Sequence, residues 1–237
     1  MFYITGDTHG DFSRLYSFCD LVQPSLDDVL IVLGDAGINY YGDSRDKKMK
    51  SRISYKYPLT LFCIHGNHEM RPTETGLPYK EKLFYGGIVY YEEAFPNILF
   101  AKDGEIYNFP TPEGEKTCLV IGGAYSVDKF YRIHKGYNWF PSEQPSEEIK
   151  KYVEDQIAKV GKKVDVVLSH TTPLKYEPVE VFLPMIDQST VDKTTEVWLN
   201  DIEASLDYQK WYCGHYHTEK LIDKIEFLYG SIKVFKS

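Results

Sequence analysis

Apolar runs of strand length recur along this chain, and they constrain its fold more than any other feature of the sequence. Each run is followed at once by Gly, Asp, His or Asn. The six runs are FYIT (2–5), VLIVL (29–33), LTLFCI (59–64), TCLVI (117–121), VDVVLS (164–169) and KWYC (210–213). Because the runs are nearly continuous and do not alternate with polar residues, they predict strands covered on both faces.

Helix-like stretches lie between these runs. Residues 12–22 carry apolar side chains at helical spacing, and so do residues 192–206. Residues 146–159 open with Ser146 and two early glutamates, which favour a helix N-terminus. Strands that alternate with helices indicate an α/β fold.

Other segments predict a second sheet, mixed or antiparallel. Residues 97–109 place Asp103-Gly104 between two strand-like runs, which is typical of a hairpin, and residues 220–235 are typical of short antiparallel strands. Residues 122–140 and the Pro- and aromatic-rich residues 135–147 are expected to form surface loops. No linker-like stretch divides the chain, so we expect one domain over residues 1–237.

Five of the runs lead directly into side chains that can bind metal ions. These side chains are Asp7 and His9, Asp35, Asn67 and His68, His170, and finally His215 with His217. Loops at the carboxyl ends of strands converge on one crevice in α/β sheets, so all five loops are expected to meet. Any one of these residues alone is more often a turn residue, but five of the seven histidines follow this pattern and only His65 and His134 do not.

The chemistry of this set predicts a hydrolytic site for two divalent ions. The donors are oxygen and imidazole without cysteine, which suits Mn, Fe, Zn or Ni better than a structural zinc site. The set exceeds what one ion needs, whereas a two-metal centre would use all of it. Such a centre needs a carboxylate that bridges the ions, and Asp35, alone on its loop, is the natural candidate.

Composition excludes several other classes of protein. The formal net charge of −8 disfavours non-specific nucleic-acid binding. The four cysteines form no C-x-x-C pair, which predicts a reducing compartment without disulfides. The N-terminus does not resemble a signal peptide, and no apolar run approaches the ~20 residues that span a bilayer. We therefore expect a soluble, cytoplasmic protein without a membrane partner.

The ordered motifs resemble those of the calcineurin-like metallophosphoesterase family. The family pattern D-x-H, G-D, G-N-H-[DE], H and G-H-x-H occurs here as Asp7-Thr8-His9, Gly34-Asp35, Gly66-Asn67-His68-Glu69, His170 and Gly214-His215-Tyr216-His217. The resemblance spans nearly the whole chain. It implies a sandwich of two mixed β-sheets flanked by helices, and it implies phosphoester hydrolysis by a water that two ions activate.

The resemblance also implies residue roles. One ion would be held by Asp7, His9, Asp35 and His217, and the other by Asp35, Asn67, His170 and His215. Asp35 would therefore bridge the two ions and serve catalysis. His68 matches a catalytic histidine that binds the phosphate and can protonate the leaving oxygen, and Asn67 also lies at the substrate phosphate. The two histidines of GHYH are expected to point to one side of a strand-like stretch.

The chain departs from the protein serine/threonine phosphatases of this family. Those enzymes carry an Asp and an Arg where this chain has Ile38 and Asn39, and an Arg where it has His65. Two phosphate-binding arginines are therefore missing, which argues against a dedicated phosphoprotein phosphatase. The missing Asp normally orients the histidine that matches His68. Arg132 is expected to contact the substrate in place of the missing arginines, with Arg71 as another candidate.

Several functions stay open at this point. The leading hypothesis is a metal-dependent phosphoesterase that acts on mono- or diesters, with a small phosphoester or nucleotide as substrate. A nucleotide pyrophosphatase, a nuclease and a protein phosphatase acting on a phosphoprotein are alternatives within the same class. A metal-stabilised binding or regulatory module without turnover is an alternative from another class.

Overall fold

The central strands bury both of their faces because each lies between a second sheet and a layer of helices. In the computed structural model, which describes residues 1–236, strand β2 (Val29–Val32) shows this arrangement. Val29 and Ile31 contact the core between the sheets, whereas Leu30 and Val32 contact the helical side. This two-sided burial explains why the run is continuously apolar.

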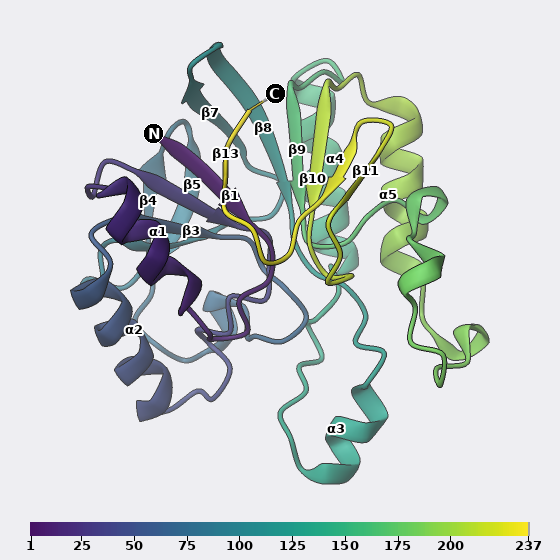
Figure 1. Cartoon of the computed structure of the whole chain (residues 1–237). Helices are drawn as coiled ribbons and strands as arrows, with labels where there is room; N and C mark the ends of the chain where they lie inside the picture. The colour runs from purple at the N-terminus through teal and green to yellow at the C-terminus, as the bar shows by residue number, and fades with distance from the viewer. Residues whose placement is uncertain (237) are drawn as a thin grey trace.

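Two mixed sheets pack face to face (Figure 1). The seven-stranded sheet has the order β13-β1-β2-β3-β6-β5-β4, and the six-stranded sheet has the order β11-β12-β10-β9-β8-β7. The first contains β1 (Phe2–Thr5), β2, β3 (Thr60–Cys63), β4 (Lys80–Phe84), β5 (Gly87–Tyr91), β6 (Ile98–Ala101) and β13 (Lys233–Val234). The second contains β7 (Ile106–Thr111), β8 (Gly114–Ile121), β9 (Val166–Ser169), β10 (Lys210–Cys213), β11 (Lys220–Ile222) and β12 (Ile225–Phe227). The predicted α/β sandwich of two mixed sheets is confirmed.

Helices flank both sheets (Figure 1). Helices α1 (Arg14–Val22) and α2 (Ser44–Lys56) lie beside the first sheet, and α4 (Glu147–Lys159) and α5 (Thr194–Ser205) beside the second. Helix α3 (Lys129–Lys135) projects away from the sandwich. Short 3₁₀ turns occupy Pro72–Glu74, Leu174–Tyr176, Val179–Val181 and Gln188–Thr190. The predicted helices correspond to α1, α4 and α5. Helix α2 was missed because it is rich in charged residues and buries few apolar ones.

The predicted hairpin over residues 97–109 is wrong. Strand β6 pairs with β3 and β5 in the first sheet, whereas β7 pairs with β8 in the second. The Asp103-Gly104 turn therefore carries the chain from one sheet to the other. Asp103 is buried there, and its Oδ1 accepts a 2.6 Å hydrogen bond from the backbone N–H of Gly122. A local sequence motif for a tight turn does not determine which strands pair on either side of it.

Two segments expected to be surface loops are more ordered than predicted. Residues 122–140 contain α3, which ends at Gly136 in a left-handed conformation. The following irregular segment buries Phe140 and Glu143. The antiparallel strands expected within residues 220–235 are confirmed by the pairing of β11 with β12. The single domain over residues 1–237 stays a prediction, and residue 237 lies outside the described residues.

The four cysteines are free thiols, and the three within apolar runs, Cys63, Cys118 and Cys213, are buried. Within residues 1–236, no helix combines the length and the apolar character needed to cross a membrane.

Candidate metal centre

Five loops, from both sheets, bring the predicted ligands together. The loops after β1, β2 and β3 belong to the first sheet, and those after β9 and β10 belong to the second. They carry, in that order, Asp7 with His9, Asp35, Asn67 with His68, His170, and His215 with His217. Three overlapping groups among these residues have geometry that could hold a metal ion: Asp7, His9 and His217; His9, Asp35 and His68; and Asp7, Asp35 and His170.

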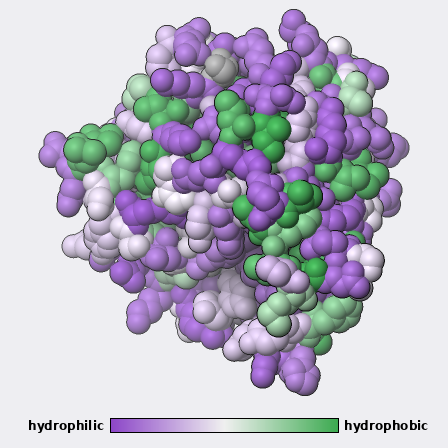
Figure 2. Space-filling model, turned by 45° about the vertical axis from the view of Figure 1, so that its right-hand side comes forward, coloured by the Kyte–Doolittle hydropathy of each residue, from purple (hydrophilic) through white to green (hydrophobic). Residues whose placement is uncertain are grey.

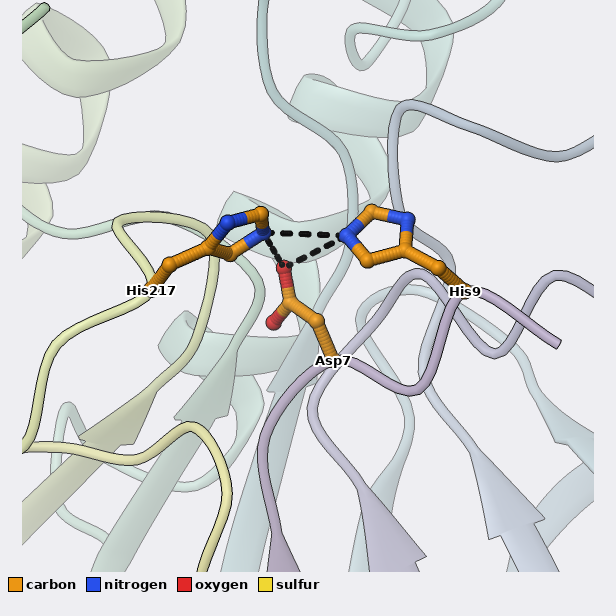
Figure 3. A group of neighbouring side chains, drawn as sticks. All are labelled: Asp7, His9 and His217. Atoms are coloured by element: carbon orange, nitrogen blue, oxygen red, sulfur yellow. Dashed lines mark hydrogen bonds and ion pairs between the residues drawn. The ribbon is translucent and has the colours of Figure 1, made fainter. Parts of the chain in front are cut away.

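Asp7, His9 and His217 form the first cluster (Figure 3). The two imidazoles lie on either side of the carboxylate, with their Nε2 atoms 2.9 Å apart. Asp7 Oδ2 lies 3.2 Å from His217 Nε2 and 3.7 Å from His9 Nε2. Its other oxygen, Oδ1, accepts a 2.9 Å hydrogen bond from the backbone N–H of His215. The carboxylate is thus held by one oxygen and turns the other toward the imidazoles.

Asn67, His170 and His215 form the second cluster. Asn67 Oδ1 lies 2.8 Å from His170 Nε2 and 3.1 Å from His215 Nδ1. The Asn67 amide nitrogen donates to the hydroxyl of Ser126, which turns the amide oxygen toward the histidines. His170 Nδ1 lies 2.8 Å from the carbonyl of Leu33, so the proton belongs on Nδ1 and the lone pair on Nε2 faces the cluster.

Asp35 lies between the two clusters. Its Oδ1 accepts a 2.8 Å hydrogen bond from the backbone N–H of His68. Its Oδ2 lies 3.8 Å from His9 Nδ1 and 3.7 Å from His170 Nε2. The free oxygen of Asp35 therefore reaches toward a member of each cluster at once, which is the arrangement that a bridging ligand requires.

The backbone at this site differs from the strand-like geometry expected for GHYH. Strand β10 ends at Cys213, and the backbone φ angles of His215 and His217 are 65° and 48°. His9 and Asp35 also adopt left-handed conformations, with φ angles of 47° and 46°. Such conformations are costly for residues other than glycine, and they gather where surrounding structure imposes them. Tight turns, and not strand alternation, thus aim both histidines at the site.

Electrostatics hold the two carboxyl groups and His215 in the states that bind cations. Burial opposes ionisation of Asp7 and Asp35, but the neighbouring histidines outweigh it and lower the pKa of both carboxyl groups. The carboxylates in turn raise the pKa of His217 and, against the effect of burial, that of His170. Burial, reinforced by His170, lowers the pKa of His215 to about 3. Two carboxylates and a neutral His215 therefore face the site at pH 7, as cation binding requires.

The donor set fits divalent cations. Asp7 Oδ2 is buried and lacks a hydrogen bond of good geometry, and the Nε2 atoms of His9 and His217 face each other. In the second cluster an amide oxygen and two imidazole nitrogens converge. Acceptor atoms that point at one another inside a protein call for a cation between them. Oxygen and nitrogen donors without sulfur suit a hydrolytic metal site.

A model of the calcineurin-like phosphoesterase family matches residues 1–230. The chain belongs to the calcineurin-like phosphoesterase family. Two other proteins are similar to this chain, one over a short stretch of sequence and one in structure at low sequence identity. The chain is 33% identical over 69 residues to a symmetrical bis(5'-nucleosyl)-tetraphosphatase of Wigglesworthia glossinidia brevipalpis. The aligned region covers 29% of this chain and 24% of that protein. A phosphopantetheinyl hydrolase from Mycobacterium tuberculosis aligns with a TM-score of 0.49 and 16% identity, over 96% of this chain and 87% of its own.

The predicted arginines do not line the cavity beside the ligands of this calcineurin-like phosphoesterase. Arg132 is buried, and its guanidinium donates to the Ser126 hydroxyl that also binds Asn67. Arg71 pairs with Asp103 in a separate cavity, which His65 also lines. His134 is exposed on α3. The Ser126 hydroxyl thus links Arg132 to Asn67. Contact of Arg132 with substrate stays a prediction.

Sequence reasoning missed Ser126 and Glu196 near the centre of this calcineurin-like phosphoesterase, and it offered Asp128 only as one of several candidates in the segment 122–140. Ser126 holds both Asn67 and Arg132. Asp128 lines the same cavity as His68, and its charge acts on that imidazole. Glu196 lines the cavity from α5, far along the chain. The polar residues after the TCLVI run could have pointed to Ser126 as well, but nothing in the sequence sets Glu196 apart from other helix glutamates.

Gly34 allows the Asp35 loop to pass against His170, and alanine there is expected to destabilise the fold strongly. Its φ is +86°, and an added Cβ would lie 2.1 Å from His170 Nδ1. We expect Gly34→Ala to lower the free energy of unfolding by on the order of 3 kcal/mol or more, measured by urea denaturation. Gly161→Ala is the matched control, because φ there is +68° with nothing within 4 Å of the added atom. It should cost about 1 kcal/mol. Equal losses in the two variants would contradict the steric argument.

Proposed function

We propose that this chain is a dinuclear metal-dependent phosphoesterase that hydrolyses small phosphate esters. The observation that carries the proposal is the position of Asp35, whose free oxygen lies between two clusters of oxygen and nitrogen donors. One ion would be held by Asp7, His9, Asp35 and His217, and the second by Asp35, Asn67, His170 and His215. Bound divalent ions would supply an activated water and neutralise charge on the phosphoryl group.

The side chains around the proposed ions have separate roles in binding and orientation. Asp35 accepts a hydrogen bond from the backbone of His68, and Asn67 donates one to Ser126, which orients both side chains before any substrate arrives. His68 lines the cavity, and burial lowers its pKa, although the charge of Asp35 opposes this. At pH 7 it is a neutral imidazole, and in our proposal its N–H donates to a phosphoryl oxygen. Ile38 is buried in the apolar core, so no carboxylate orients His68 from that position.

A panel of phosphoesters with added divalent metals tests this proposal. We expect Mn²⁺- or Ni²⁺-stimulated hydrolysis of p-nitrophenyl phosphate or of its bis-ester, measured as release of p-nitrophenol. A dinucleoside polyphosphate in the same panel tests the activity that the relative from Wigglesworthia is named for. Folded protein that hydrolyses none of these substrates with any divalent metal would overturn the proposal. If it nevertheless binds two metal ions, a binding module without turnover would take its place.

A further inference from the structure

The cavity that contains the proposed metal ligands extends well beyond them. Its volume is about 430 Å³, which lies within the range of small-molecule sites. His9, Asp35, Asn67, His68, His215 and His217 line the cavity, and so do residues of the segment 177–196. Figure 2 brings the right-hand side of Figure 1 forward, the side where α5 lies, and shows hydrophobic residues among hydrophilic ones there. The cavity is therefore large enough for a phosphate and an organic group attached to it.

Apart from the residues near the proposed ions, the cavity lining combines apolar side chains with acidic ones. Val181, Phe182, Leu183, Ile186 and Val191 supply the apolar surface. The acidic residues are Asp128, Glu177, Asp192 and Glu196, and we call this part of the cavity, with the five apolar residues, the acidic arm. Burial raises the pKa of Glu196 to about 7, so this carboxyl group is partly ionised at pH 7, and a bound cation would favour its ionised form. Among the described residues that line the cavity, Lys193 is the one cation, and it pairs with Glu177 at 2.7 Å. A second phosphate in the acidic arm would meet negative charge without a free cation to offset it.

Glu196 gives the acidic arm an unsatisfied hydrogen-bonding atom. The residue is 3% exposed, and its Oε1 accepts a 2.8 Å hydrogen bond from the hydroxyl of Thr171. Its Oε2 is buried and has no hydrogen-bond partner. Buried polar atoms are almost always paired in folded proteins, so an unpaired one beside a cavity indicates that a ligand supplies the partner. The ligand group that suits a carboxyl oxygen is an N–H donor, and a cationic one suits the acidic arm best.

We propose that the acidic arm binds the organic group of a phosphate monoester whose alcohol carries a protonated amine and an apolar portion. The amine would donate to Glu196, and the apolar portion would contact Phe182 and Ile186. Water would add to phosphorus as the ester P–O bond breaks, which gives inorganic phosphate and the free amino alcohol. This inference rests on the proposed phosphoesterase activity. It argues against dinucleoside polyphosphates, because these carry further phosphates on the organic side of the scissile bond.

Two aryl phosphates matched in size test the charge preference. They are 4-(aminomethyl)phenyl phosphate and 4-carboxyphenyl phosphate, which differ in the sign of the charge that enters the acidic arm. We expect kcat/KM to favour the amine by at least about tenfold, and we expect Glu196→Gln to reduce that ratio about fivefold or more. Glu203→Gln is the matched control on α5, since Glu203 contacts Tyr176 and Tyr208 outside the cavity. It should leave the ratio unchanged.

A second variant at the exposed rim avoids any effect on folding. Leu183 lines the cavity but is 60% exposed, so a lysine there can be accommodated without burying its charge. Leu183→Lys is expected to lower the preference for the amine, whereas Leu183→Gln should keep it. Hydrolysis of both aryl phosphates at equal rates would overturn this inference alone. Failure to hydrolyse either of them or p-nitrophenyl phosphate would overturn the proposed function as well.

Discussion

Replacement of Asp35 by asparagine is expected to lower kcat/KM for p-nitrophenyl phosphate by a thousandfold or more, about 4 kcal/mol of transition-state stabilisation. The side chain keeps its size but loses its charge, and Asp35 is the group whose free oxygen reaches toward both clusters. Without that charge two divalent ions would repel each other with no anion between them. The measurements are steady-state kinetics with added Mn²⁺ and the metal content of the purified variant.

The control for Asp35→Asn is Asp20→Asn, which makes the same substitution at an exposed position on α1. It should retain full activity and full metal content. Circular dichroism and thermal unfolding establish that both variants fold. A folded Asp35→Asn protein with metal-stimulated activity close to that of the wild type would exclude a bridging role for this carboxylate.

Alanine substitutions of His215 and His217 are expected to weaken different ions. His217 lies with Asp7 and His9, and His215 lies with Asn67 and His170. Each single variant should bind close to one ion per chain after dialysis, by elemental analysis, and each should lose about a hundredfold in kcat/KM. Because the proposed mechanism uses both ions, the two variants should look alike in activity and differ in which ion remains.

Double variants reveal which ion each histidine holds. Adding His9→Ala to His217→Ala should cost little more metal, because both residues serve the same proposed ion. Adding His215→Ala to His217→Ala should remove both ions. This pattern is the non-additivity expected of residues that act on one site. His134→Ala, exposed on α3, should keep both ions. Equal metal loss in the two double variants would contradict the assignment.

The strands and the convergence of the loops followed from the sequence because they rest on local signals. A strand covered on both faces is apolar at nearly every position, and FYIT and KWYC coincide with β1 and β10. The same local logic failed at Asp103-Gly104, where a turn signal cannot tell a hairpin from a passage between sheets. Local signals also gave no sign that His215 and His217 take left-handed conformations, because loops from other strands impose them.

Cavity residues that come from distant elements were the hardest to foresee. Glu196 belongs to a helix and reaches the cavity only because α5 packs beside the second sheet. Arg132 was expected at the substrate because the family arginines are missing, and that contact stays a prediction. Its hydrogen bond to Ser126 was not foreseen. Side-chain direction at such positions depends on tertiary packing, which a single sequence does not encode in any short motif.

The convergence of loops from both sheets has a mechanical consequence. Each proposed ion would take ligands from both sheets: Asp7, His9 and Asp35 with His217 in one case, and Asp35 and Asn67 with His170 and His215 in the other. A bound ion would then act as a non-covalent cross-link between the two halves of the sandwich. Separation of the sheets would release both ions, so each could add about 4 kcal/mol of apparent stability at a thousandfold excess over its Kd. The stability of the fold would thus rise with the concentration of the metal ions that the proposed catalytic centre binds.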